Sequence, residues 1–293
     1  MKTVNAFVEG LKLVLRYRKY WFLLYGFNLL FALIAAYPFR ILVRRYFGHS
    51  LSAGAFLTQF DFMALTNFLK DNAPALSVMT ALLVVIGLFY WIFQYFFAGG
   101  LYYLFLNEDA PKDLPNFWKM AAIYFGRFMR ILLIGVILWI VVLFIYFGLL
   151  EGLSVIKKHL FNEIFSSLLR GGILAIVLVI ILFFNMLLDY TKTFLVLDEQ
   201  SSVLKSFLKA IGFVFKHSLN TLSLYYLVSL AGAFLIVSYL LGSTFFNGEQ
   251  AVSLLILFGI QQILIFLKIG LRLEFYASQI ALVKMTRWPF SYF

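Results

Sequence analysis

Long apolar runs separated by short polar segments form the main pattern along the chain. Six runs approach or reach the roughly 20 residues that a helix needs to cross a bilayer. Runs such as 173–182 do not alternate apolar and polar positions, and backbone groups in lipid must bond within their own segment, so each run predicts a transmembrane helix. The predicted spans are 21–38, 76–97, 131–149, 172–188, 221–241 and 252–271.

A short basic and aromatic segment precedes each successive pair of spans. The three segments begin at Phe7, Phe117 and Phe207, and a basic residue closes each one at its tenth or eleventh position. We interpret the chain as three repeats of an amphipathic interfacial helix followed by a transmembrane hairpin, within a single membrane domain (residues 1–293). The repeats cover 1–110, 111–200 and 201–293, and the fold class is an all-α integral membrane protein with six transmembrane helices.

The second segment shows the amphipathic pattern most clearly. Its apolar positions recur at helical spacing, and the cations lie off that stripe, so a helix over 114–128 is expected to lie in the membrane interface with its apolar side in lipid. Equivalent helices are expected near 3–18 and 201–217, either as binding platforms or as elbows that orient each hairpin. The apolar stripe comprises Phe117, Ala121, Tyr124, Phe125 and Phe128. The cations expected to contact lipid headgroups are Lys12, Arg16, Arg18, Lys119, Arg127, Arg130, Lys209 and Lys216.

Composition supports the membrane assignment. The chain is 63% hydrophobic and 13% charged, against about 45–50% and about 25% in soluble domains. The net charge of +11 is scattered in clusters beside apolar runs, which favours anionic lipid over nucleic acid as the partner. The chain has no cysteine, which excludes disulfides and thiolate chemistry.

The distribution of basic residues predicts the orientation. With both termini in the cytoplasm, 17 of the 24 Lys and Arg residues fall on the inner side and 7 on the outer side, as the positive-inside rule requires. Arg40, Arg44 and Arg45 are the exception, and we expect them to contact headgroups on the outer face.

Polar residues within spans are costly and therefore mark candidate sites. Asn185, Asp189 and Lys192 share one face of the fourth span. Gln261, Lys268 and Arg272 form a stripe on the sixth, and Gln94 lies near the end of the second. We expect Asp189 to pair with Lys192, Lys268 or Arg272 and to clamp the fourth and sixth helices. The alternative is that this polar cluster lines a transport pathway.

No motif for catalysis is visible in the sequence. The three histidines, His49, His159 and His217, lack metal-ligand spacing, and no nucleophile elbow, Walker loop or Rossmann fingerprint occurs. We therefore predict no enzymatic activity, no cofactor and no metal site.

Several stretches of the second half resemble a known pattern. The stretches 189–198, 210–217 and 222–227, with Gln261, Gln262 and the region 272–279, resemble uncharacterised bacterial six-span proteins similar to the membrane domains of glycerophosphodiester phosphodiesterases. The resemblance implies a bacterial inner-membrane protein without a catalytic domain, and it supplies no residue of known role. The predicted function is an accessory module that engages lipids or a membrane-protein partner. A transporter for an apolar or amphiphilic substrate is the alternative.

Overall fold

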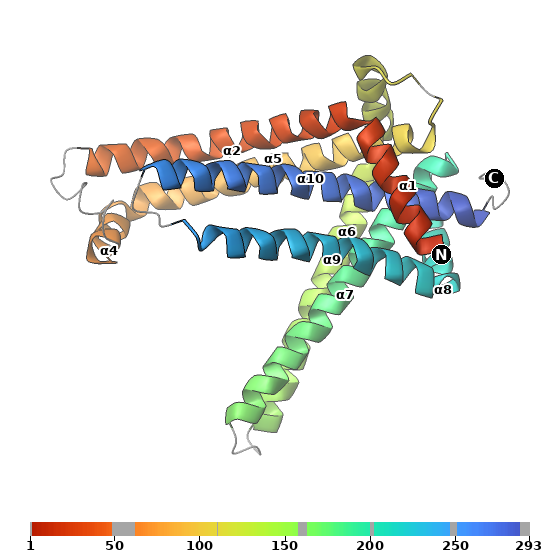
Figure 1. The fold of residues 1–293 in the computed structure, drawn as a ribbon. Coiled ribbons are helices and arrows are strands. Elements are labelled where there is room, and N and C mark those ends of the chain that lie inside the picture. The colour runs from red at the N-terminus through yellow and green to blue at the C-terminus, as the bar shows by residue number, and fades with distance from the viewer. Residues whose placement is uncertain are drawn as a thin grey trace. The chain divides into compact units, whose positions relative to one another are not determined.

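The computed structural model describes residues 2–48, 62–109, 111–157, 163–199, 202–246 and 251–287, and within these ranges the secondary structure is helical (Figure 1). The predicted all-α class is confirmed. The helices are α1 (Lys2–Arg16), α2 (Arg18–Phe47), α4 (Phe62–Asp71), α5 (Ala73–Leu106), α6 (Leu114–Lys157), α7 (Glu163–Leu197), α8 (Val203–Lys216), α9 (Ser218–Ser243) and α10 (Ala251–Arg287).

Six helices are long and apolar enough, by length and composition, to cross a membrane: α2, α5, α6, α7, α9 and α10. Each contains one of the predicted spans, so the chain is a polytopic membrane protein. The helices are nevertheless longer than the spans. α6 has 44 residues, or about 66 Å at 1.5 Å per residue, whereas the apolar layer of a bilayer is about 30 Å thick. Helix α6 therefore continues well beyond the apolar layer.

The chain forms two compact units. Unit 1 comprises Met1–Gly10, Tyr95–Tyr225 and Tyr276–Phe293, and unit 2 comprises Leu11–Gln94 and Tyr226–Phe275. Helices α1, α5, α9 and α10 contribute residues to both units.

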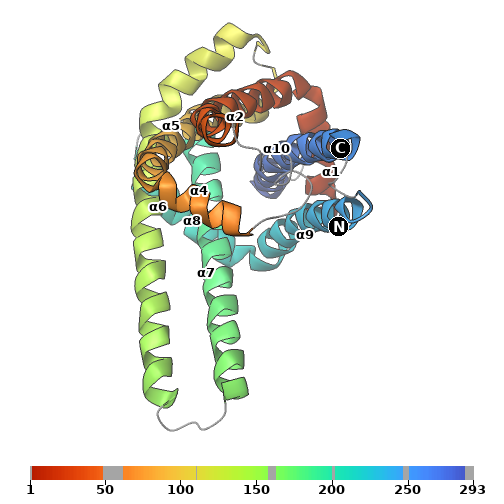
Figure 2. The same ribbon diagram turned by 90° about the vertical axis from the view of Figure 1, so that its left-hand side faces the viewer.

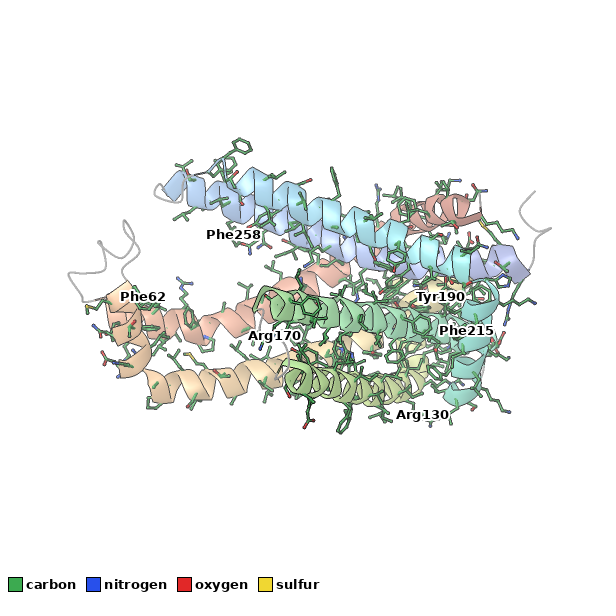
Figure 3. The ribbon with its side chains drawn as sticks, turned by 90° about the horizontal axis from the view of Figure 1, so that it is seen from below. Phe62, Arg130, Arg170, Tyr190, Phe215 and Phe258 are labelled. Carbon is green, nitrogen blue, oxygen red and sulfur yellow. The ribbon has the colours of Figure 1, made fainter. Side chains whose placement is uncertain are left out.

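In unit 1, α6 and α7 run side by side as a hairpin (Figures 1 and 2). The buried residues gather where α6 begins and α7 ends, together with the end of α5, with α8 and with the last turns of α10. At Gly100 of α5, an added Cβ would lie 2.6 Å from the ring of Phe117, so α5 and α6 approach closely there. Figure 3 shows Arg130 near this packed end and Arg170 toward the other. The core includes Phe97, Leu101, Phe105, Phe117, Phe128, Ile131, Tyr190, Phe194, Ala210 and Val214.

In unit 2, aromatic side chains join α2 to α5 and to the first part of α10. The ring of Phe31 lies 5.6 Å from both Tyr90 and Phe93 of α5. Trp21 stacks on Phe266 at 4.5 Å, and its indole N–H donates to the Phe266 carbonyl at 2.7 Å. These contacts set the spacing of the three helices.

The short helix α4 packs against the end of α2. Its buried Phe68 contacts the rings of Phe39, Tyr46 and Phe47 at 6.5, 5.1 and 5.5 Å. The Tyr46 hydroxyl donates to the Asp71 carboxylate at 2.8 Å. Helix α4 is therefore fixed to α2 by both apolar and polar contacts.

Two of the three predicted interfacial segments are separate helices. Helices α1 and α8 each end one residue before the following long helix, at Tyr17 and His217. The backbone N–H of each of these two residues still donates to the carbonyl oxygen of the residue four positions earlier, at 3.0 Å. The expected helices over 3–18 and 201–217 are thus present.

The prediction for the second segment was confirmed only in part, because residues 114–128 are helical but do not form a separate helix. Residues 114–128 are the first turns of the continuous helix α6. Its stripe does not face lipid, because Phe117, Ala121, Tyr124 and Phe128 are buried in unit 1. The sequence could not separate the two cases, because a stripe that packs against protein and one that enters lipid have the same periodicity.

Candidate functional site

The strongest polar cluster of unit 1 surrounds Lys192 on α7. Its Nζ lies 2.7 Å from Oδ1 of Asp189, one turn earlier on the same helix. The side chains of Lys192 and Asp189 are only 9% and 17% exposed. A buried charge needs such a partner, because removing it from water costs several kcal/mol otherwise.

Two tyrosine rings complete the environment of this lysine. The Nζ atom lies over the ring of Tyr95 on α5, 5.1 Å from its centroid, and 5.6 Å from that of Tyr276 on α10. Tyr276 in turn packs on Tyr102 at 4.9 Å, and the Tyr102 hydroxyl donates weakly to the backbone carbonyl of Asp189 at 3.4 Å. The cation–π contacts of Lys192 therefore join α7 to α5 and α10.

The structure confirms one of the three pairings expected for Asp189. The expected form of the clamp is corrected, however. The ion pair lies within α7 and does not itself bridge to the sixth helix, and the link to α10 is the contact between Lys192 and the Tyr276 ring. A lysine and a carboxylate three residues apart meet on one helix face without any tertiary constraint.

The other predicted polar residues lie elsewhere. In unit 2, Nη1 of Arg272 donates to Oε1 of Gln94 at 2.8 Å, joining α10 to α5. Gln261 and Lys268 are exposed on α10. In unit 1, half-buried Asn185 lines a small cavity of about 10 Å³ between α6 and α7, which is about the space that one water needs.

A second charged junction joins the end of α7 to α8 and α10 in unit 1. The Asp198 carboxylate accepts from Nζ of Lys209 at 2.8 Å and from Nη1 of Arg287 at 2.7 Å. Partial burial would raise the pKa of Asp198, but the hydrogen bonds from Arg287 and Lys209 outweigh it and hold the pKa below its ordinary value. Lys209, which we expected to contact headgroups, is thus engaged within the protein.

Helix α8 presents three distinct faces. One is packed against the protein and one is apolar but exposed, with Leu204, Leu208 and Phe215 at 66%, 66% and 67% exposure. The third carries Lys205, Lys209 and Lys216, which are exposed. Figure 3 places Phe215 on α8. The packed face comprises Val203, Ser206, Ala210 and Val214.

Helix α1 repeats this arrangement at an offset of 200 residues. Its buried Ala6, Gly10 and Val14 correspond to the packed positions of α8. Its exposed apolar residues are Val4, Val8, Leu11 and Leu15. Exposed Lys12 and Arg16 lie beside that apolar stripe.

The predicted headgroup cations differ in their surroundings. Lys12, Arg16, Arg18, Lys119, Arg130, Lys209 and Lys216 are exposed. Arg127 is half-buried, with its guanidinium over the Tyr124 ring at 5.5 Å. Sequence analysis missed Lys205, which lies four residues before Lys209 and on the same helix face.

Comparisons of the chain with protein-family models, with curated proteins and with solved structures find no match.

Proposed function

We propose that the chain is a non-enzymatic accessory module of the membrane, in which α1 and α8 lie in the interface and bind anionic lipids. The observation that carries this proposal is the exposed apolar stripe of α8 beside its lysines. A helix with such a pattern places its apolar side at the boundary of the acyl chains and its cations toward phosphates.

The connections of α8 support this placement. Five residues connect the membrane-spanning candidate α7 to α8, and one residue connects α8 to the membrane-spanning candidate α9. Its 14 residues extend about 21 Å. Both ends of α8 are therefore tethered to the ends of apolar helices on one side of a membrane, and its exposed apolar stripe needs no further partner than lipid.

Three acidic residues of unit 1 support a structural role for the charged groups around them. Asp189 binds Lys192, Asp198 binds Lys209 and Arg287, and Glu108 accepts from Lys284 of α10 at 3.3 Å. We assign these groups to holding helix ends together rather than to catalysis or transport.

The proposal includes the threefold repeat and the orientation. The shared register of α1 and α8 supports two copies of one unit. When the second copy is shifted by one residue from the alignment of the leading phenylalanines, its buried positions Phe117 and Ala121 match Ala6 and Gly10. Ala122 and Gly126 then stand where α1 exposes Leu11 and Leu15. Loss of the apolar stripe accounts for a segment that packs inside the protein. The proposal puts both termini in the cytoplasm of a bacterial inner membrane, and the bias of basic residues supports this orientation.

Spin labels at single cysteines test the proposed position of α8, because the chain has no cysteine of its own. Leu208→Cys and Lys205→Cys, each labelled in vesicles containing phosphatidylglycerol, should differ in exposure. The label at 208 should collide mainly with oxygen, which concentrates in the apolar layer. The label at 205 should collide mainly with a nickel chelate, which stays in water. Equal access of the chelate to both labels would refute an interfacial α8.

The lipid preference needs a second measurement. Lys205→Gln together with Lys216→Gln should reduce the phosphatidylglycerol that copurifies with the full chain, relative to the control Lys112→Gln outside α8. An unchanged lipid content would refute lipid binding by these lysines. A protein that copurifies in fixed ratio and is lost from the same variant would assign the lysines to a protein partner instead.

A further inference from the structure

We infer that unit 2 holds one anionic phospholipid in a groove between α2 and α5, in the leaflet opposite the N-terminus. The groove has a volume of about 440 Å³, within the range of small-molecule sites. Its walls are almost wholly apolar. The lining residues are Ala32, Ala35, Ala36, Pro38 and Phe39 of α2 and Met79, Leu82 and Leu83 of α5.

Aromatic side chains lie at both ends of the groove. Toward the start of α2, Phe31 contacts Tyr90 and Phe93 of α5. Toward its end, Phe39 contacts Phe68 of α4. Helix pairs separate by about 8–10 Å according to the side chains between them, and the alanines between these two aromatic clusters are too small to fill the space. Figure 3 shows α4, which begins at Phe62, at this end of the unit.

Arginines continue the groove wall beyond the apolar part. Ala32, Ala36, Arg40 and Arg44 follow one another at intervals of four residues, so they form one ridge along α2. From Ala32 to Arg44 the helix rises about 18 Å. Half of the apolar layer is about 15 Å thick, so an acyl chain along the alanines would place its phosphate beside the two arginines.

The charge of this ridge identifies the occupant. Arg40, Arg44 and Arg45 are exposed, and no ion pair links them to another residue in the described part of unit 2. Guanidinium groups bind phosphate through paired hydrogen bonds. An anionic phospholipid satisfies both the apolar groove and the cations, and it accounts for basic residues on the side where the positive-inside rule disfavours them.

Native mass spectrometry of the full, delipidated chain tests the inference. Titration with phosphatidylglycerol should show one molecule bound more tightly than phosphatidylcholine. Arg40→Gln together with Arg44→Gln should weaken phosphatidylglycerol binding by about tenfold or more, since each lost charged hydrogen bond changes affinity by about that factor. The control Lys70→Gln removes an exposed cation of α4 at the same end and should leave binding unchanged.

Filling the groove provides an independent arm. Ala36→Phe should abolish tight binding of both lipids. Ala32→Leu is a smaller change, included in case Ala36→Phe disturbs folding, and it should weaken binding. Ala81→Phe is the matched control, because Ala81 is exposed and does not line the groove. Unchanged phosphatidylglycerol binding in both groove variants would overturn the inference. Displacement of the lipid by glycerol phosphate alone would also overturn it, because the arginines would then bind a free phosphate.

This inference does not rest on the proposed role of α1 and α8. Lys205→Gln with Lys216→Gln should leave the tightly bound lipid in place, and the groove variants should leave the spin label at 208 buried in lipid. Loss of the tight site in the α8 variant would assign that lipid to α8 and refute the groove.

Discussion

Replacing Lys192 by Met tests whether the cluster around Asp189 holds the helices of unit 1 together. Methionine keeps the length and most of the apolar contact of the lysine stem but removes its charge. The Asp189 carboxylate would lose the Nζ that now lies 2.7 Å away, and the rings of Tyr95 and Tyr276 would lose the cation above them.

The expected cost follows from the burial of the pair. Removing one partner of a buried ion pair costs about 3–5 kcal/mol, and each cation–π contact contributes about 0.5–2 kcal/mol. Asp189 retains some exposure, at 17%, so water can partly solvate its freed carboxylate. We therefore expect Lys192→Met to lower the free energy of unfolding by about 3 kcal/mol, the lower end of that range.

The measurement is a denaturant titration in detergent followed by tryptophan fluorescence, to which Trp118 contributes from the core of unit 1, where its ring lies 5.6 Å from Phe97. Adding Asp189→Asn to Lys192→Met should restore at least about 1 kcal/mol, because it removes the uncompensated charge. Lys119→Met on the exposed side of α6 is the control and should stay within about 0.5 kcal/mol of the unmodified chain. A loss below about 1 kcal/mol for Lys192→Met, or strict additivity in the double variant, would refute the clamp.

Two further changes test other contacts of unit 1. Gly100→Ala should cost about 1–3 kcal/mol, because its Cβ would overlap the Phe117 ring. Gly126→Ala, which meets nothing within 4 Å, should be neutral or stabilising in the same titration, and an equal loss in both variants would refute the close approach. The lowered pKa of Asp198 means that its ionised form stabilises the fold above the ordinary Asp pKa of about 4. As the pH falls below that value the unmodified chain should lose this stability and Asp198→Asn should not, so parallel pH–stability curves would refute the contribution of Arg287 and Lys209.

The sequence predicted the spans well because the solvent of a span is lipid. A run of apolar residues can satisfy its backbone only as a helix there, so length and hydropathy are sufficient to locate it. Helix ends were harder to predict. Helix α2 continues through Pro38 to Phe47, whereas the break between α1 and α2 at Tyr17 occurs without a glycine or proline. Tertiary packing decides such boundaries, and the local sequence does not encode it.

Within the polar cluster, the predictable part was the local part. Asp189 and Lys192 are three residues apart, so their meeting follows from helix geometry. Tyr95 and Tyr276 come from distant helices, and one sequence gives no information on which helices are neighbours. The same limit applies to Arg272, whose partner Gln94 lies 178 residues earlier in the chain.

The distribution of buried side chains in unit 1 indicates where lipid and where water is the alternative to protein contacts. Along the middle of α6, apolar side chains such as Leu133, Ile137 and Phe144 remain exposed, which costs nothing in a bilayer because lipid is as apolar as another helix. At the packed end of the hairpin, Phe117 and Phe128 are fully buried and the charged pairs occur. Hydrophobic burial can drive helix association only where the alternative solvent is water. The packed end of unit 1 is therefore the part in which protein contacts, rather than lipid, determine the fold.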